Sequence, residues 1–279
     1  MNLTIYGTSS SEGFPSLFCQ CESCQEGRRR GGKSIRTRSG SVVDGKILID
    51  FGPDILAQSQ KGLPIHEIDH LFFTHSHADH LNASDLHYII PPFSKRPDGK
   101  KLHVYGNAAV LEKLQRYKDE ERYHDYLEFH LLEALCPVWV EDYEIIPIPT
   151  FHDTKEQCMI YVIRHGGETI LFGTDSAYFP EETLESLYQY QYDLIVFDCT
   201  SLEAGGHFKN HMGLPDNKRA EDMLRTHGCI HPGTQIAVTH FAHTFYPVHE
   251  HVEKLAAAYG YIAAYDGISL DVKKFDINV

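Results

Sequence analysis

The heptapeptide THSHADH, residues 74–80, constrains the fold of this chain more than any other stretch of its sequence. It directly follows IDHLFF, whose length and Leu and Phe content predict a buried strand. If the chain stays extended at the strand end, residues two apart in sequence point to the same side. The potential metal ligands of the motif are His75, His77, Asp79 and His80. A polar surface turn is the alternative, but so dense a ligand pattern predicts a metal site at the end of a strand.

Apolar runs and turn signals predict that strands and helices alternate along the rest of the chain. Residues 39–52 predict a hairpin that turns at Asp44-Gly45. Other strands are predicted at 3–7, 101–105, 143–149, 159–164, 168–172, 193–198, 235–239 and 261–271, and helices near 53–60, 107–117, 181–190, 216–227 and 248–259. The segment 117–135 is also interpreted as helical. Two layered sheets flanked by helices would accommodate this order in one domain spanning residues 1–279.

The charge balance limits the class of substrate. A formal net charge of −14 repels polyanions, which argues against extended nucleic acid and anionic membranes and favours a small substrate. The opening MNLTIYGTSS has neither the basic nor the apolar segment of a signal peptide, and no later run reaches membrane-spanning length. We therefore expect a cytoplasmic protein with reduced thiols, and leave open whether it forms a homodimer.

Cysteine and histidine usage points to metals. Cys19, Cys21 and Cys24 lie within six residues and suit a soft ion such as zinc, but a closed tetrahedral site needs a fourth ligand. His243 is a candidate because it follows His240 closely and has no other task. The remaining cysteines are expected in the core: Cys136, Cys158, Cys199 and Cys229. The total of 19 histidines exceeds what core packing needs.

The motif THSHADH, preceded by ILIDFG, resembles that of the metallo-β-lactamase superfamily. Later pieces of the family pattern follow in order: PIPTFHD with His152, LFGTDSA with Asp175, and IAVTHF with His240. The resemblance implies an αββα four-layer sandwich with a two-metal site at one edge of its sheets. It also implies the ligands: His75, His77 and His152 for one metal, Asp79, His80 and His240 for the other, and Asp175 as a bridge.

Mixed imidazole and carboxylate ligation suits zinc or manganese. Two such cations about 3.5–4 Å apart can hold a bridging hydroxide as nucleophile, so hydrolysis is the expected chemistry. Asp79 is expected to be catalytic as well as a ligand. In NHMGL, His211 resembles the proton donor of the phosphodiesterase branch of the superfamily, with His207 as a competitor. Asp50 is expected to orient a ligand imidazole, and Asp198, also at a strand end, receives no role.

The segment CQCESC resembles the Cys-x-Cys-x-x-Cys element of the PhnP-type cyclic phosphodiesterases. This resemblance implies a structural zinc held by Cys19, Cys21, Cys24 and His243, on an N-terminal loop at about residues 15–30. The leading hypothesis is hydrolysis of a small phosphodiester, of the cyclic ribose phosphate or cyclic nucleotide type. The alternatives are a thioesterase or lactonase, a tRNA-processing nuclease, a PqqB-like cofactor-biosynthesis protein, and a non-enzymatic metal-binding or redox-sensing module.

Overall fold

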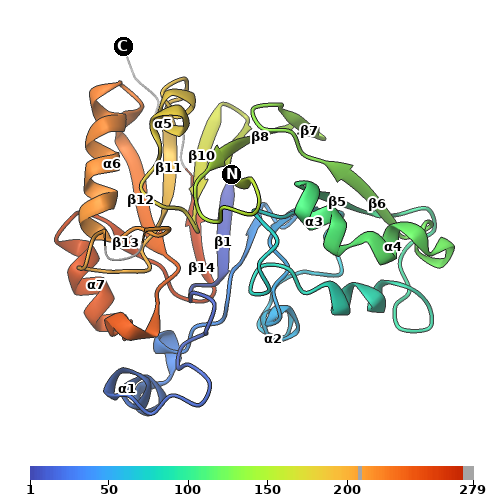
Figure 1. Cartoon of the computed structure of the whole chain (residues 1–279), viewed down its shortest axis with the longest axis horizontal. Coiled ribbons are helices and arrows are strands. Elements are labelled where there is room, and N and C mark those ends of the chain that lie inside the picture. Colours follow the sequence, from blue (N-terminus) through green and yellow to red (C-terminus); the bar gives the residue numbers. More distant parts are fainter. Residues whose placement is uncertain (207–208, 273–279) are drawn as a thin grey trace.

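The computed structural model describes residues 1–206 and 209–272. Within these ranges the strands form two seven-stranded sheets that stand side by side (Figure 1). The first sheet runs in the order β14 (Ile268–Asp271), β1 (Asn2–Gly7), β2 (Gly40–Val43), β3 (Ile47–Ile49), β4 (His70–Phe72), β5 (Leu102–Gly106) and β6 (Leu127–Leu131). The second runs β13 (Ile262–Ala263), β12 (Ile230–Thr239), β11 (Tyr192–Asp198), β10 (Glu168–Gly173), β9 (Cys158–His165), β8 (Tyr143–Thr150) and β7 (Val138–Val140).

Both sheets follow the same pairing plan. In the first, β14, β1, β2 and β3 pair antiparallel, and β3, β4, β5 and β6 pair parallel. In the second, β7, β8, β9 and β10 pair antiparallel, and β10, β11, β12 and β13 pair parallel. The carboxyl ends of neighbouring parallel strands meet at one edge of a sheet, which is where α/β folds place their ligands.

Three apolar clusters build the layers. One fills the space between the sheets and includes Phe72, Tyr161 and Leu194. A second covers the outer face of the second sheet, under helices α5 (Glu181–Leu187), α6 (Leu214–Thr226) and α7 (His249–Ala257). The third covers the outer face of the first sheet, under α2 (Ile55–Gln60), α3 (Ala108–Lys113) and α4 (Gln115–Asp119). This arrangement confirms the predicted αββα four-layer sandwich.

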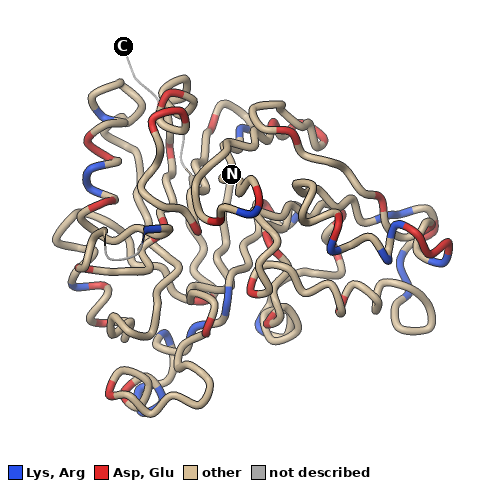
Figure 2. The backbone as a smooth tube through the Cα atoms, viewed as in Figure 1, with Lys and Arg blue, Asp and Glu red and all other residues tan. Residues whose placement is uncertain are grey.

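The remaining helix, α1 (Glu22–Arg30), lies below the sandwich in Figure 1, and the short 3-10 helices are η1 (Gly32–Ser34), η2 (Ala83–Ile89), η3 (Glu121–Tyr123) and η4 (His243–Phe245). On α1, α4 and α6, basic residues are interspersed with acidic ones (Figure 2).

Within residues 1–206 and 209–272, no helix combines the length and apolarity needed to cross a membrane.

The predicted hairpin is confirmed. Strands β2 and β3 pair antiparallel, and Asp44 and Gly45 both have positive φ, at 49° and 69°, as the tight primed turns of hairpins require. Two other predictions were wrong. The segment 117–135 is helical only at its start, because Leu127 is buried and Glu128 exposed in the two-residue period of β6. Cys136 is exposed and does not lie in the core, whereas Cys158, Cys199 and Cys229 are buried.

Candidate active site

The site is built from residues at or just beyond the carboxyl ends of strands in both sheets. The strands are β3, β4, β8, β10, β11 and β12, and the residues are Asp50, His75, His77, Asp79, His80, His152, Asp175, Asp198 and His240. Asp50, Asp175 and His240 adopt left-handed backbone conformations, with φ of 65°, 54° and 67°. Such conformations are strained for residues other than glycine, and clustered strain of this kind is typical of functional sites.

The metal ligands suggested by the sequence lie together in two adjoining groups. His75, His77 and His152 form one, and Asp79, His80, Asp175 and His240 form the other, with the potential ligand atoms of each group within 4.8 Å of one another. The buried carboxylate of Asp175 contacts both. Its Oδ2 lies 2.7 Å from His80 Nε2 and 3.4 Å from His75 Nε2, and its Oδ1 lies 3.4 Å from His152 Nδ1.

Buried nitrogen atoms in this cluster fit a cation. The Nε2 atoms of His75 and His240 have no hydrogen-bond partner among the described residues, although they lie 3.4 and 3.7 Å from Asp175 Oδ2. A buried polar atom without a partner carries a desolvation cost, which coordination of a metal would remove. Imidazole nitrogens and carboxylate oxygens at this spacing can hold two divalent cations of the zinc or manganese kind.

Carboxylates behind the ligands fix the orientation of their rings. Asp50 Oδ2 lies 2.6 Å from His80 Nδ1, and Asp50 Oδ1 accepts hydrogen bonds from the backbone N–H and the hydroxyl of Thr74. On the second sheet, Asp198 Oδ2 lies 3.3 Å from His240 Nδ1 and accepts from the hydroxyl of Thr200. A carboxylate behind a ligating histidine sets its tautomer and ring direction.

His211 lies between this support and the cavity. Its Nδ1 is 3.1 Å from Asp198 Oδ2 and 3.2 Å from Asp175 Oδ1. Burial opposes protonation of His211, but Asp198 and Asp175 together raise its pKa above the ordinary value. Burial likewise opposes ionisation of Asp198, yet His211 and His240 lower the pKa of that carboxyl to about 2. The pair therefore holds the imidazole of His211 in its charged form next to the ionised carboxylate of Asp198. A protonated imidazole suits a proton donor.

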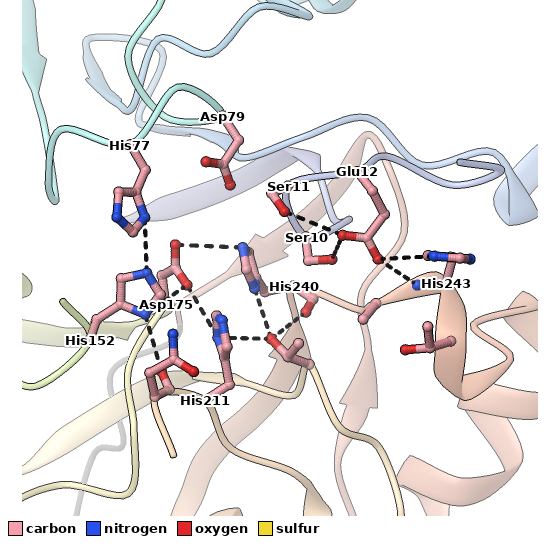
Figure 3. Close-up of a pocket in the computed structure, with 14 residues that line it drawn as sticks. Ser10, Ser11, Glu12, His77, Asp79, His152, Asp175, His211, His240 and His243 are labelled. Atoms are coloured by element: carbon pink, nitrogen blue, oxygen red, sulfur yellow. Dashed lines mark hydrogen bonds and ion pairs between the residues drawn. The ribbon is translucent and has the colours of Figure 1, made fainter. Parts of the chain in front are cut away.

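The cluster opens into a cavity of about 530 Å³. His77, Asp79, His152, Asp175 and His211 line one part of it, as Figure 3 shows. Ser10, Ser11, Glu12 and His243 line the other part. Thr244 is a further lining residue. The volume fits a small molecule, and the lining offers hydroxyl, imidazole and carboxylate groups for hydrogen bonding.

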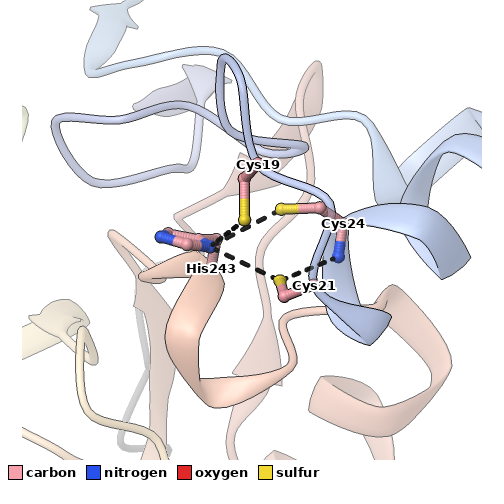
Figure 4. Close-up of side chains that lie close together, drawn as sticks. All are labelled: Cys19, Cys21, Cys24 and His243. Carbon is pink, nitrogen blue, oxygen red and sulfur yellow. Dashed lines mark hydrogen bonds between the residues drawn. The ribbon is translucent and has the colours of Figure 1, made fainter.

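The three neighbouring cysteines meet His243 beside this cavity (Figure 4). His243 Nδ1 lies 3.7 Å from Cys19 Sγ, 3.8 Å from Cys21 Sγ and 3.5 Å from Cys24 Sγ. Tetrahedral zinc with ordinary Zn–S and Zn–N bonds requires S···N separations of about 3.6 Å. The backbone N–H of Cys24 also donates to Cys21 Sγ at the start of α1, which holds the loop closed. This cluster therefore fits a closed structural zinc site.

Residues 46–241, more than half of the chain, match the family model described as the Beta-lactamase superfamily domain. The chain belongs to this superfamily. Its fold family binds divalent metals, usually zinc, and the two groups of histidine and aspartate supply candidate ligands. The chain is therefore a member of the metal-dependent hydrolases of the metallo-β-lactamase superfamily, as the motif predicted.

Solved structures of this superfamily match nearly the whole chain. A new diphosphatase from the PhnP family has a TM-score of 0.74 and 24% identity, covering 98% of each chain. Zn(2+)-bound PqqB from Methylobacterium extorquens has a TM-score of 0.73 and 18% identity, over 97% of this chain and 100% of that one. The short form of human tRNase Z has 0.67 and 16%, over 98% and 100%. No curated protein matches the sequence. These similarities establish the fold.

Several residues of this superfamily site were not predicted to have a role. Asp198 is a buried partner of His211 and His240, and its position at the end of an apolar strand was the only signal in the sequence. Asp153 Oδ2 lies 2.9 Å from His77 Nε2. Glu156 accepts from the hydroxyl and backbone N–H of Ser76 at 2.7 and 3.0 Å, which anchors the loop that carries the candidate ligands His75 and His77.

The remaining predicted site residue, His207, lies outside the described residues. Among the described residues, the structure places every predicted metal ligand either in the two histidine and aspartate groups or in the cluster of three cysteines and His243, and it places His211 beside Asp175.

Proposed function

We propose that this superfamily member hydrolyses a small phosphodiester, using two divalent cations at the histidine and aspartate cluster. The observation that supports this most is the position of Asp175. One buried carboxylate contacts His75 and His152 of the first group and His80 of the second, as a shared ligand between two cations must. His75, His77 and His152 would hold one cation, and Asp79, His80 and His240 the other, in keeping with the ligand order of the family.

When bound, two such cations supply an activated nucleophile at neutral pH and neutralise charge on the phosphoryl oxygens. The chain itself supplies the proton for the leaving group. His211, held by Asp198 at 3.1 Å, reaches the cavity wall and would donate its proton to the leaving alkoxide oxygen. Asp198 would keep the imidazole protonated and correctly turned for this transfer, so we assign it as a positioning residue.

Asp79 has a second task in the proposed reaction. Its carboxylate lines the cavity, 3.2 Å from His80 Nε2, and is better placed for contact with substrate than the deeper ligands. In addition to holding a cation, it would accept a hydrogen bond from the attacking water and so orient it. His152 Nδ1, 3.1 Å from the carbonyl oxygen of Asn210, ties the loop that carries His211 to the metal cluster.

The substrate class follows from the cavity. A volume of about 530 Å³ accommodates a sugar phosphate or a mononucleotide, and much less readily a folded nucleic acid. One similar structure is named a diphosphatase of the PhnP family, which supports hydrolysis at a phosphoryl centre. We favour a cyclic ribose phosphate or cyclic nucleotide, because a cyclic diester is compact and its leaving alkoxide needs the proton that His211 would provide.

We also propose that Cys19, Cys21, Cys24 and His243 hold a structural zinc. Four ligands complete a tetrahedron and leave no open position for substrate, so this ion would not take part in hydrolysis. It would connect the N-terminal loop to the segment that follows His240, because His243 comes three residues after that catalytic-site ligand.

A hydrolysis screen tests the proposal. The metal-loaded protein is offered bis-p-nitrophenyl phosphate, cyclic nucleotides, ribose cyclic phosphates, a diphosphate ester, a lactone and a thioester. Activity on the cyclic diesters that disappears in Asp175→Asn is the expected result. Turnover of thioester or lactone with no diester activity would contradict the proposal and favour the thioesterase alternative, and turnover of the diphosphate alone would favour a diphosphatase.

A further inference from the structure

We propose a further divalent-metal site on the first sheet, formed by His103 of β5 and by Glu128 and His130 of β6. It would take a transition ion of the zinc, nickel or copper(II) class. His103 and Glu128 lie near the amino-terminal ends of β5 and β6, His130 lies two residues further along β6, and none of the three belongs to the candidate active site. It is independent of the hydrolytic function proposed above.

The distances suit a metal. His103 Nδ1 lies 3.1 Å from His130 Nε2, and the Glu128 carboxylate oxygens lie 3.9 Å from the first nitrogen and 3.7 Å from the second. Two imidazole nitrogens bound to one tetrahedral zinc are separated by about 3.3 Å. The nitrogen pair is thus already at ligand spacing, and the exposed carboxylate needs only a small rotation to complete the set.

Strand pairing and ring stacking hold the two histidines in place. His103 pairs with Glu128 across the strands, and Tyr105 pairs with His130 in the same register. The Tyr105 ring stacks on His130 with centroids 4.5 Å apart, and the His70 ring stacks on His103 at 5.1 Å. Rings fixed in this way lose little freedom when an ion binds, which is the condition for a preorganised ligand set.

The candidate active site contains a pair of histidines with which the His103–His130 distance can be compared. There, His77 Nδ1 and His152 Nε2 also lie 3.1 Å apart, and both belong to the set of ligands that the family pattern assigns to one metal. The nitrogen atoms of these two candidate ligands therefore lie close to the separation that binding to one ion requires. The separation of 3.1 Å between His103 and His130 matches that spacing.

The cluster is also accessible to a metal ion. The side chains of His103, His130 and Glu128 are 32%, 33% and 48% exposed, so an ion can enter from solvent.

The test is a zinc titration of the full chain, with bound zinc counted by metal analysis after equilibrium dialysis. His130→Phe removes the ligand nitrogen and keeps a ring against Tyr105. We expect it to bind one equivalent of zinc less than the parent protein, with hydrolytic activity unchanged. His227→Phe is the matched control, because His227 stacks on Tyr188 at 3.6 Å and belongs to none of the clusters described above. It should bind as much zinc as the parent.

Glu128→Ala provides a second variant that does not depend on core packing, since this side chain is about half exposed. We expect it to keep the fold and to weaken binding of the same equivalent by at least about tenfold, because loss of a ligand should cost no less than loss of a residue that only supports one. Equal zinc content and affinity in the parent, His130→Phe and Glu128→Ala would overturn the proposal and leave His103 and His130 as a hydrogen-bonded pair. Loss of the equivalent in His227→Phe as well would show adventitious binding and overturn it too.

Discussion

Cys19, Cys21, Cys24 and His243 form the thiolate cluster, which borders the same cavity as the histidine and aspartate cluster. The two clusters are built in different ways. Three of the four thiolate-cluster residues come from a single six-residue segment, and its sulfur atoms surround one imidazole at 3.5–3.8 Å. The other cluster collects its residues from strand ends of both sheets and exposes His77 and Asp79 to the cavity. A closed set of soft ligands suits an ion that stabilises structure, and an open set of nitrogen and oxygen ligands suits one that contacts substrate. The predictions below test this difference.

Asp175→Ala should have the largest effect on activity. It removes the carboxylate that contacts both groups of histidines, and metal ions contribute several kcal/mol to transition-state stabilisation, so we expect a loss of about a thousandfold in kcat/KM. Metal analysis should show weaker binding at this cluster and an unchanged thiolate-bound zinc. A variant with nearly parental activity would remove Asp175 from the site.

His211→Ala should produce the next largest effect, and only on some substrates. A proton donor is needed when the leaving group is a basic alkoxide, so we expect a loss of about a hundredfold on cyclic nucleotides. With p-nitrophenolate, which leaves without a proton, the loss should stay below about tenfold. Metal content is expected to match that of the parent. Equal losses on both substrate types would exclude His211 as the acid.

Asp198→Asn sharpens that result. Asp198 does not line the cavity but lies 3.1 Å from His211 Nδ1, so it should act through the histidine. Since Asp198 raises the pKa of His211, its loss lowers the pH above which the acid is deprotonated. The pH profile of kcat on a cyclic nucleotide should therefore lose its high-pH side earlier than in the parent. An unshifted profile would indicate a purely structural role.

The sequence indicated the residues of the candidate site because they mark the carboxyl ends of strands, and a buried strand with a polar end is a local pattern. His75, His152, Asp175 and His240 could each be found in this way. The pairing of Asp198 with His211 could not, because it depends on the path of the loop between them. Contacts between side chains on neighbouring strands are equally hard to find in the sequence.

Long-range pairing also explains what was missed on the first sheet. His103 and His130 come from neighbouring strands that are joined through α3 and α4, and no spacing in the sequence reveals their contact. The segment 117–135 was assigned to helix because its polar, Tyr-rich composition hides the two-residue period of β6. There, burial of Leu127 in the core of the first sheet outweighs local propensity.

His243→Ala changes the thiolate cluster and leaves the histidine and aspartate cluster intact. It should lower the zinc content by one equivalent and lower the melting temperature by on the order of 5–10 °C, because binding of a structural zinc stabilises the folded chain. Activity should fall only several-fold, since we assign His243 to the structural zinc and not to the chemistry. Cys21→Ser is expected to act alike. If His243→Ala retains the zinc as tightly as the parent, His243 is not the fourth ligand.

Glu12→Gln should give the smallest effect and tests the contact between the two regions. Glu12 lines the cavity, its Oε1 accepts the backbone N–H of His243 at 2.9 Å, and its Oε2 accepts the Ser10 hydroxyl at 2.7 Å. Glutamine keeps the shape and one acceptor but removes the charge beside the His243 ring, whose Nε2 is 4.0 Å from Oε1. A carboxylate near a ligating histidine strengthens metal binding by about tenfold or more, so the thiolate-bound zinc should bind about that much more weakly.

Activity of Glu12→Gln should change by less than about threefold, because no predicted ligand of the hydrolytic cations contacts Glu12 in the described part of the chain. Competition with a chromophoric chelator measures the zinc affinity, and Glu22→Gln, in the first turn of α1, is the control for an acidic residue near the cysteines that does not contact His243. A large loss of activity with zinc affinity unchanged would place Glu12 in contact with substrate. The division between a closed structural cluster and an open catalytic one would then have to include this residue on the catalytic side.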